Sequence, residues 1–232
     1  MFNLKSLLLL AKYNLKIVFG GKFIWFAIVA VVFFVFLLFQ IAYDGTEPTE
    51  DLVYSSLLMP ALMLIFYPTV YGLQNDEENK ILEIIFSIPN YMYKVWLLRL
   101  IFVFIESFVI LLLLCVVANF LFCPIEIFEM AIQMMSPLFF FGNLAFLLST
   151  IIKGGNGTAV VFIFVVAGLV MLGQSYSNTM WNVLINPFSE IDTIHPTVWA
   201  NTLANNRLFL FAASFGCILV ALMNLQKRER LL

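Results

Sequence analysis

Six long runs of apolar residues alternate with shorter polar segments along this chain. Each run approaches the about 20 consecutive apolar residues that a helix needs to cross a bilayer. The predicted spans are about 23–42, 52–73, 97–122, 131–152, 158–175 and 207–225. Because the runs are continuously apolar, without the period of two of a membrane strand, they predict helices. We therefore predict an all-α integral membrane protein with one transmembrane domain, residues 1–232, of six transmembrane helices.

Composition supports this class. Hydrophobic residues make up 63% of the 232 residues, charged residues make up 11%, and the mean hydropathy is +1.02. Soluble domains are about 45–50% apolar and about 25% charged, so a soluble globular fold is excluded. The net charge of −2 gives no reason to expect nucleic acid as a partner. Three cysteines at or within apolar runs form neither a disulfide framework nor a metal-binding spacing.

The basic residues predict the orientation of the chain. Eleven of the twelve Lys and Arg residues lie before the first span, in the segment 74–99 that leads into the third span, between spans four and five, or after the sixth span. Cytoplasmic segments carry an excess of such residues. We therefore expect a multi-pass protein of the plasma (bacterial inner) membrane with both termini in the cytoplasm. The remaining basic residue, Arg207, stands at the boundary of the sixth span.

Two segments outside the spans have helical periodicity. In residues 3–19, Lys5, Lys12 and Lys16 share one face, which predicts an amphipathic helix on the membrane surface; the alternative is simple anchoring by basic side chains. In residues 74–99, acidic residues precede an apolar run that Pro89 ends. Its apolar face must be buried on a partner or on the membrane. The acidic start disfavours the membrane, because inner leaflets are anionic.

The stretch from Glu78 to Pro89, with Arg99 ten residues on, resembles a motif in the membrane subunits of type-2 ATP-binding-cassette (ABC) exporters. Lys80-Ile81 stands where that motif has Gly-Thr. The resemblance extends to the whole architecture: a surface helix, six spans and a long outer segment between spans five and six. It implies a cytoplasmic coupling helix between spans two and three, and short outer helices between spans five and six. The residues that it assigns to coupling with an ATPase are Glu77, Glu78, Ile81, Leu82, Glu83, Ile85, Phe86 and Pro89.

The resemblance also implies the partners. The chain lacks the G-x-x-x-x-G-K-[ST] phosphate-binding loop, so we expect it to be no enzyme by itself and to hold no cofactor. ATP and Mg²⁺ would be bound by two copies of a cytoplasmic ABC ATPase subunit. A second permease subunit, a homodimer copy or a paralogue, would complete the exporter, surrounded by membrane lipid. The implied function is outward transport of an amphipathic or lipid-like substrate, driven by the ATPase.

Other functions have weaker support. A non-transporting scaffold or sensor subunit of an ABC-like complex stays open as the main alternative. An intramembrane enzyme would need several ionisable residues at one depth, and an ion-coupled carrier would need repeated polar positions in broken helices. Within the spans, Glu106 is the one deeply placed ionisable residue. A lone His195 matches no catalytic or metal-binding pattern, so neither kind of site is predicted.

Three residues within the spans are candidates for the transport pathway or a subunit interface: Glu106, Met135 and Phe139. For Glu106, the alternative is a carboxyl group that is protonated or hydrogen-bonded to a neighbouring span. For Met135 and Phe139, the alternative is packing within the bundle or against lipid. The sequence leaves both alternatives open.

Overall fold

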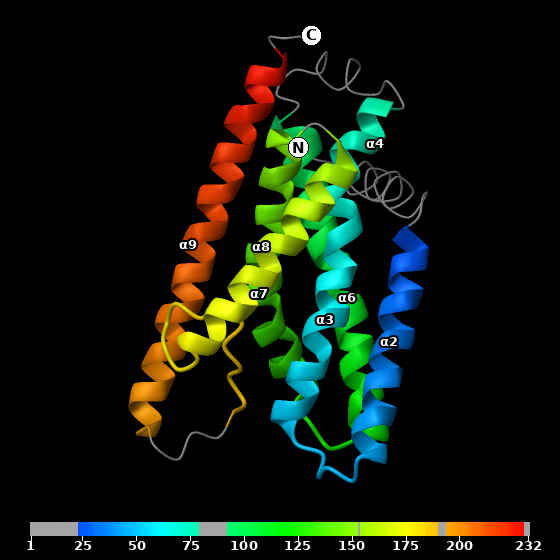
Figure 1. Ribbon diagram of the computed structural model, residues 1–232, viewed down its shortest axis with the longest axis vertical. Helices are drawn as coiled ribbons and strands as arrows, with labels where there is room; N and C mark the ends of the chain where they lie inside the picture. Colours follow the sequence, from blue (N-terminus) through cyan, green and yellow to red (C-terminus); the bar gives the residue numbers. More distant parts are fainter. Residues whose placement is uncertain (1–22, 79–91, 153, 190–193, 230–232) are drawn as a thin grey trace, which may run out of the picture.

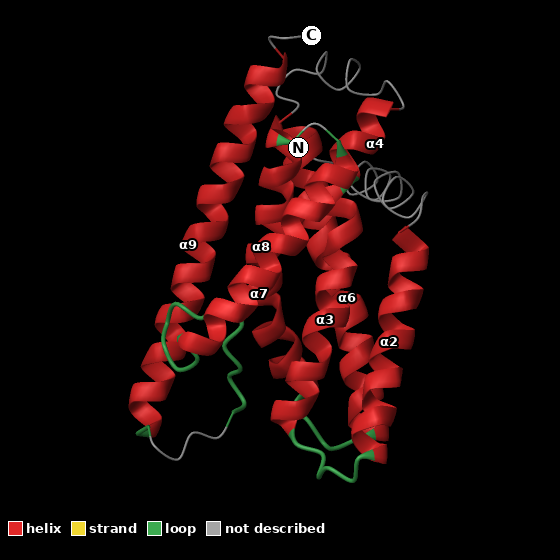
Figure 2. Cartoon of the chain, viewed as in Figure 1, coloured by secondary structure: helices red, strands yellow, loops and turns green. Residues whose placement is uncertain are grey.

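The computed structural model describes residues 23–78, 92–152, 154–189 and 194–229. The regular structure of these residues is entirely helical (Figure 2). In chain order the helices are α2 (Phe23–Tyr43), α3 (Glu50–Val70), α4 (Gly72–Glu78), a π-helical turn (Met92–Leu97), α6 (Leu98–Leu121), α7 (Ile127–Ile151), α8 (Gly155–Ser175) and α9 (Pro196–Glu229). Across this described part, six helices are long and apolar enough to cross a membrane. The prediction of an all-α, multi-pass membrane protein is confirmed.

Helix α7 lies at the centre of the bundle, packed against α9, α3 and α6 and in contact with α8 (Figure 1). The buried core is built mainly from α3, α6 and α7 and includes Tyr54, Leu111 and Phe141. Helices α2, α8 and α9 leave long apolar faces exposed. Such faces are unfavourable in water, but they match the apolar chains of a bilayer.

The chain changes direction where α3 gives way to α4. Pro68 has no backbone N–H, and α3 ends two residues later at Val70. The Thr69 hydroxyl donates to the Ile65 carbonyl at 2.6 Å, and the Tyr71 N–H donates to the Tyr67 carbonyl at 3.0 Å. These bonds close the end of α3. The chain bends at Tyr71 and continues as the short helix α4.

The segment between α8 and α9 differs from the expectation. Its described residues 176–189 form turns in place of short helices, and α9 begins at Pro196, eleven residues before the predicted start at 207. Asparagine side chains explain the turns, because they bond to nearby backbone and compete with helix formation. Asn186 Oδ1 accepts from the Phe188 N–H at 2.9 Å, and Asn182 Oδ1 accepts from the Leu184 N–H at 3.1 Å.

Two predicted features lie outside the described residues. They are the surface helix over residues 3–19 and the part of the coupling helix that contains Ile81, Leu82, Glu83, Ile85, Phe86 and Pro89. Both stay predictions. Glu77 and Glu78, the first two predicted coupling residues, are the last two residues of α4.

Candidate functional site

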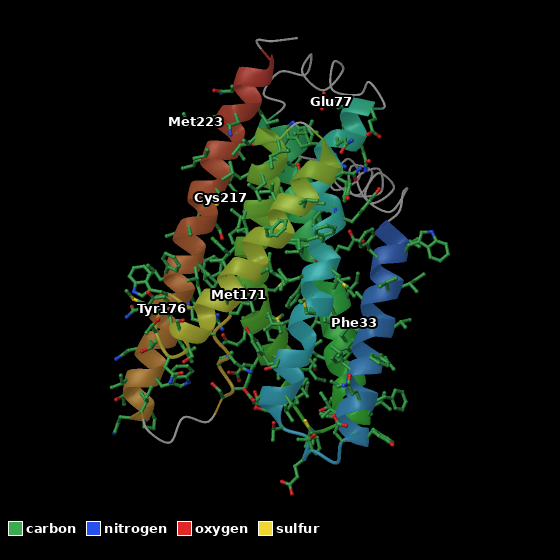
Figure 3. The ribbon with its side chains drawn as sticks, in the orientation of Figure 1. Phe33, Glu77, Met171, Tyr176, Cys217 and Met223 are labelled. Carbon is green, nitrogen blue, oxygen red and sulfur yellow. The ribbon has the colours of Figure 1, made fainter. Side chains whose placement is uncertain are left out.

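Helix α4 stands at one end of the bundle, directly before the predicted coupling segment. Figure 3 shows Glu77 at the tip of α4, and this side chain and that of Glu78 are exposed. On the other side of α4, Asp76 is buried. We call this end of the molecule the α4 end. The candidate site is the set of contacts that join α4 to the membrane-spanning helices.

The strongest of these contacts is an ion pair between α4 and α6. Arg99 Nη1 donates to Asp76 Oδ2 at 2.6 Å, although the residues are 23 positions apart. The two side chains are only 11% and 6% exposed. Charge-assisted bonds of this length are among the stronger hydrogen bonds in proteins. Removing one partner from a buried pair costs roughly 3–5 kcal/mol, because the other charge is left without compensation.

The surroundings of Arg99 hold its guanidinium group in place. The carbon at its centre lies 5.8 Å from the centroid of the Trp96 ring, within the range of a cation–π contact. On the other side, a Cβ atom added to Gly72 would lie 3.5 Å from the same carbon, so the guanidinium group lies closely against the first residue of α4. Trp96 itself is buried against Phe146 of α7. The arginine is therefore positioned by both α4 and the core.

Further contacts join α4 to α3 and to α8. Asn75 Nδ2 donates to the Tyr67 hydroxyl of α3 at 3.2 Å. The Gly155 N–H at the start of α8 donates to Gln74 Oε1. A Cβ atom added to Gly155 would lie 2.5 Å from the Tyr71 ring and would also collide with Gln74 Oε1, so both side chains would have to shift. Helix α4 is thus bonded to the ends of α3, α6 and α8.

A separate apolar groove of about 460 Å³ opens on the membrane-facing surface between α2, α3 and α8. Its lining includes Phe26, Met63, Phe66, Phe162, Val166 and Met171. Phe66 of α3 and Phe162 of α8, which both line it, are in ring contact with centroids 5.8 Å apart. The volume falls within the about 300–1,000 Å³ of typical small-molecule sites. Such a groove suits an acyl chain and offers almost nothing to a polar solute.

The residues predicted for the pathway lie elsewhere. Met135 and Phe139 are on α7 and are absent from the lining of the groove. The Phe139 ring packs between Phe104 of α6 and Phe211 of α9, at centroid distances of 4.9 and 5.5 Å. Glu106 is on the buried side of α6 at 7% exposure, and neither carboxyl oxygen has a hydrogen-bond partner within the structure described. Met135 and Phe139 pack against one and the same apolar cluster of the bundle, away from the groove.

Sequence reasoning missed several of the site residues. Asp76 and Arg99 were visible as charges that flank the predicted coupling segment, but their pairing depends on how α4 folds back onto α6. Gln74 and Gly155 carried no signal at all, since a glutamine and a glycine in polar linkers are ordinary. The described ranges contain no group of three His, Cys, Asp or Glu side chains close enough to hold a metal ion.

Comparison of the chain with protein-family models, with curated proteins and with solved structures gives no match.

Proposed function

We propose that this chain is the membrane subunit of an ATP-driven exporter of the type-2 ABC class. Separate cytoplasmic ATPase subunits would bind the coupling helix predicted around Glu83, with Mg²⁺ and ATP on the ATPase side. A second permease subunit, a copy of this chain or a paralogue, would complete the pathway. The α4 end would face the cytoplasm of a bacterial cell. The substrate would be amphipathic or lipid-like.

The observation that carries the proposal is the bonding of α4 to three membrane-spanning helices. The predicted coupling residues begin with Glu77 and Glu78, the last two residues of α4. A partner that pulls on this segment would displace α4, and the Asp76–Arg99 ion pair would carry the displacement to α6. The bond between Gln74 and Gly155 would carry it to α8. Packed helices transmit such displacements because a close-packed interior has little free volume in which to absorb them.

The groove between α2, α3 and α8 supports the substrate class. Its lining is apolar and it opens toward lipid, so a molecule with an acyl chain could enter from the bilayer. Two of the helices that bound it, α3 and α8, also bear contacts to α4. Displacement of α4 would therefore change the width of the groove. This link between the coupling segment and an apolar site is what an exporter of lipid-like molecules requires.

The proposal is tested by purifying the tagged chain from its own membrane and measuring vanadate-sensitive ATP hydrolysis in the purified complex. We expect hydrolysis to accompany the chain and to be lost in Glu83→Lys and in Ile85→Asp. Glu47→Lys, a charge reversal in the linker before α3, is the matched control and should retain hydrolysis. Absence of hydrolysis with the unaltered chain, or its full retention in both coupling variants, would contradict the proposal.

A further inference from the structure

The end of the bundle opposite α4 holds a second arginine in a different environment. Arg207 is on α9, where its Nε donates to Gln133 Oε1 of α7 and its Nη1 donates to Asn206 Oδ1, both at 3.1 Å. Both acceptors are neutral amide oxygens. Whereas Arg99 meets a carboxylate, no carboxylate of the described residues lies within 4.0 Å of Arg207. No carboxylate of the described residues therefore balances its positive charge.

Two hydrogen-bond donors at this arginine are unused. Arg207 Nη2 is buried and has no hydrogen-bond partner in the part of the chain that is described. The Tyr54 hydroxyl of α3, which is also buried, has its oxygen facing the guanidinium group, and its O–H proton finds no acceptor among the described residues. Buried polar groups are nearly always bonded, so a pair of unused donors indicates a missing acceptor.

The missing acceptor must also carry negative charge. A buried carboxyl such as that of Glu106 can become neutral by taking up a proton, but a guanidinium group stays charged at any pH that a protein experiences. A charge held away from water is stable only when an opposite charge or strong hydrogen bonds compensate it. An oxyanion supplies both, because its oxygens accept from Arg207 Nη2 and from the Tyr54 hydroxyl together.

The depth of the cluster matches that of charged groups on membrane amphipaths. Tyr54 is four residues from the start of α3 and Gln133 is six residues from the start of α7. At 1.5 Å per residue, these positions lie about 6 and about 9 Å from the helix ends. The headgroup region of a bilayer has a similar thickness, about 5–8 Å on each side of the hydrocarbon.

We propose that Arg207, Tyr54 and Gln133 form a binding site for a phosphate-type oxyanion at the end of the bundle opposite α4. The guanidinium group supplies the charge and one free N–H donor, Tyr54 supplies an O–H donor, and Gln133 holds the guanidinium group in position. The phosphate of an anionic phospholipid or of a similar amphipath has the required chemistry, as does free phosphate. The site does not depend on the proposed transport function.

Trp181 is a natural reporter for this site. Its ring packs against Phe209, two residues after Arg207, at a centroid distance of 5.1 Å. The full-length chain, purified in an uncharged detergent, is titrated with brominated phosphatidylglycerol, whose bromine quenches tryptophan fluorescence. The same titration of Trp181→Phe gives the signal of the other three tryptophans, and the difference isolates the site. Parallel titrations use brominated phosphatidylcholine, and inorganic phosphate as a competitor.

We expect Arg207→Gln to weaken binding of phosphatidylglycerol about tenfold or more, since a charge-assisted bond is lost. Tyr54→Phe should weaken it a few-fold. Arg207→Lys keeps the charge and should restore most of the affinity. Lys227→Gln, at the other end of the same helix, is the control and should bind as the unaltered chain does. Competition by inorganic phosphate would identify the ligand as a free oxyanion, and its absence would identify a lipid headgroup.

Three results would overturn the proposal: equal affinity in the unaltered chain and Arg207→Gln, equal affinity for the anionic and the zwitterionic lipid, or a Lys variant as weak as the Gln variant. Thermal unfolding without lipid separates binding from a purely structural role. A structural arginine would lower the melting temperature of Arg207→Gln even without ligand. If the Arg207 charge is uncompensated, Arg207→Gln should leave the melting temperature without lipid unchanged or raise it. Only the stabilisation by phosphatidylglycerol should then disappear.

Discussion

Arg99 Nη1 lies 2.6 Å from Asp76 Oδ2. Arg99 belongs to the membrane-spanning helix α6, whereas Asp76 belongs to α4, the short helix that follows α3. Both side chains are withdrawn from solvent. The pair holds α4 against α6 directly before Glu77 and Glu78, the first two predicted coupling residues. Its removal should affect both the stability of the fold and the transmission of motion, and these effects can be measured separately.

Breaking the ion pair should destabilise the chain. We expect Asp76→Asn to reduce the free energy of unfolding by roughly 3–5 kcal/mol, because the Arg99 charge is left buried without its partner. The double variant Asp76→Asn with Arg99→Gln should recover part of this loss, since no charge then remains. Thermal unfolding of the purified chain in detergent checks both. A double variant that is less stable than the unaltered chain by the sum of the losses in Asp76→Asn and Arg99→Gln would show that the residues do not act as a pair.

The contact between α4 and α8 depends on a glycine. Gly155→Ala places a Cβ atom 2.5 Å from the Tyr71 ring and against Gln74 Oε1, so both side chains must move. We expect a loss of about 1–3 kcal/mol in the free energy of unfolding, as for other overpacked sites. Gly168→Ala on the same helix meets no atom within 4 Å and is the matched control. Similar melting temperatures for the two variants would show that α8 does not press against α4.

Filling the apolar groove should block an acyl ligand. Val166→Trp adds an indole to a side chain that lines the groove, whereas Phe164→Trp on the same helix changes a side chain that is 73% exposed and outside the lining. We expect Val166→Trp to reduce binding of a pyrene-labelled fatty acid several-fold, and Phe164→Trp to leave it unchanged. Fluorescence titration in detergent measures both. A reduction of the same size in the two variants would argue against the groove as the binding site.

The orientation of the chain can be tested with cysteines placed at its two ends. Thr46 precedes α3 at one end and Glu77 ends α4 at the other. In a background without Cys115, Cys123 and Cys217, we expect a membrane-impermeant maleimide to label Thr46→Cys in intact bacterial cells. Glu77→Cys should react only after the cells are made permeable. The reverse pattern would place the α4 end outside and rule out coupling to a cytoplasmic ATPase.

The sequence predicted the six helices well because the hydrocarbon layer demands a long apolar run for each, and this demand is local. It predicted the outer segment less well. Polar residues 196–206 gave no apolar signal, yet they are helical as the first part of α9. The interactions at the two ends of the bundle could not be predicted from the sequence. The partner of Asp76 and the neighbours of Arg207 come from helices distant in the chain, and their proximity depends on packing.

In the proposed exporter, α4 transmits the action of an ATPase to the membrane-spanning helices. The most direct measurement is ATP-dependent movement of a fluorescent phospholipid, labelled on its headgroup, across the bilayer of proteoliposomes that contain the whole purified complex. We expect the unaltered complex to move the lipid only with ATP. The complex with Asp76→Asn should still hydrolyse ATP but should move little lipid, because α4 is no longer held to α6. Equal ATP-driven movement in both complexes, or movement of the lipid independent of ATP, would contradict coupling through α4.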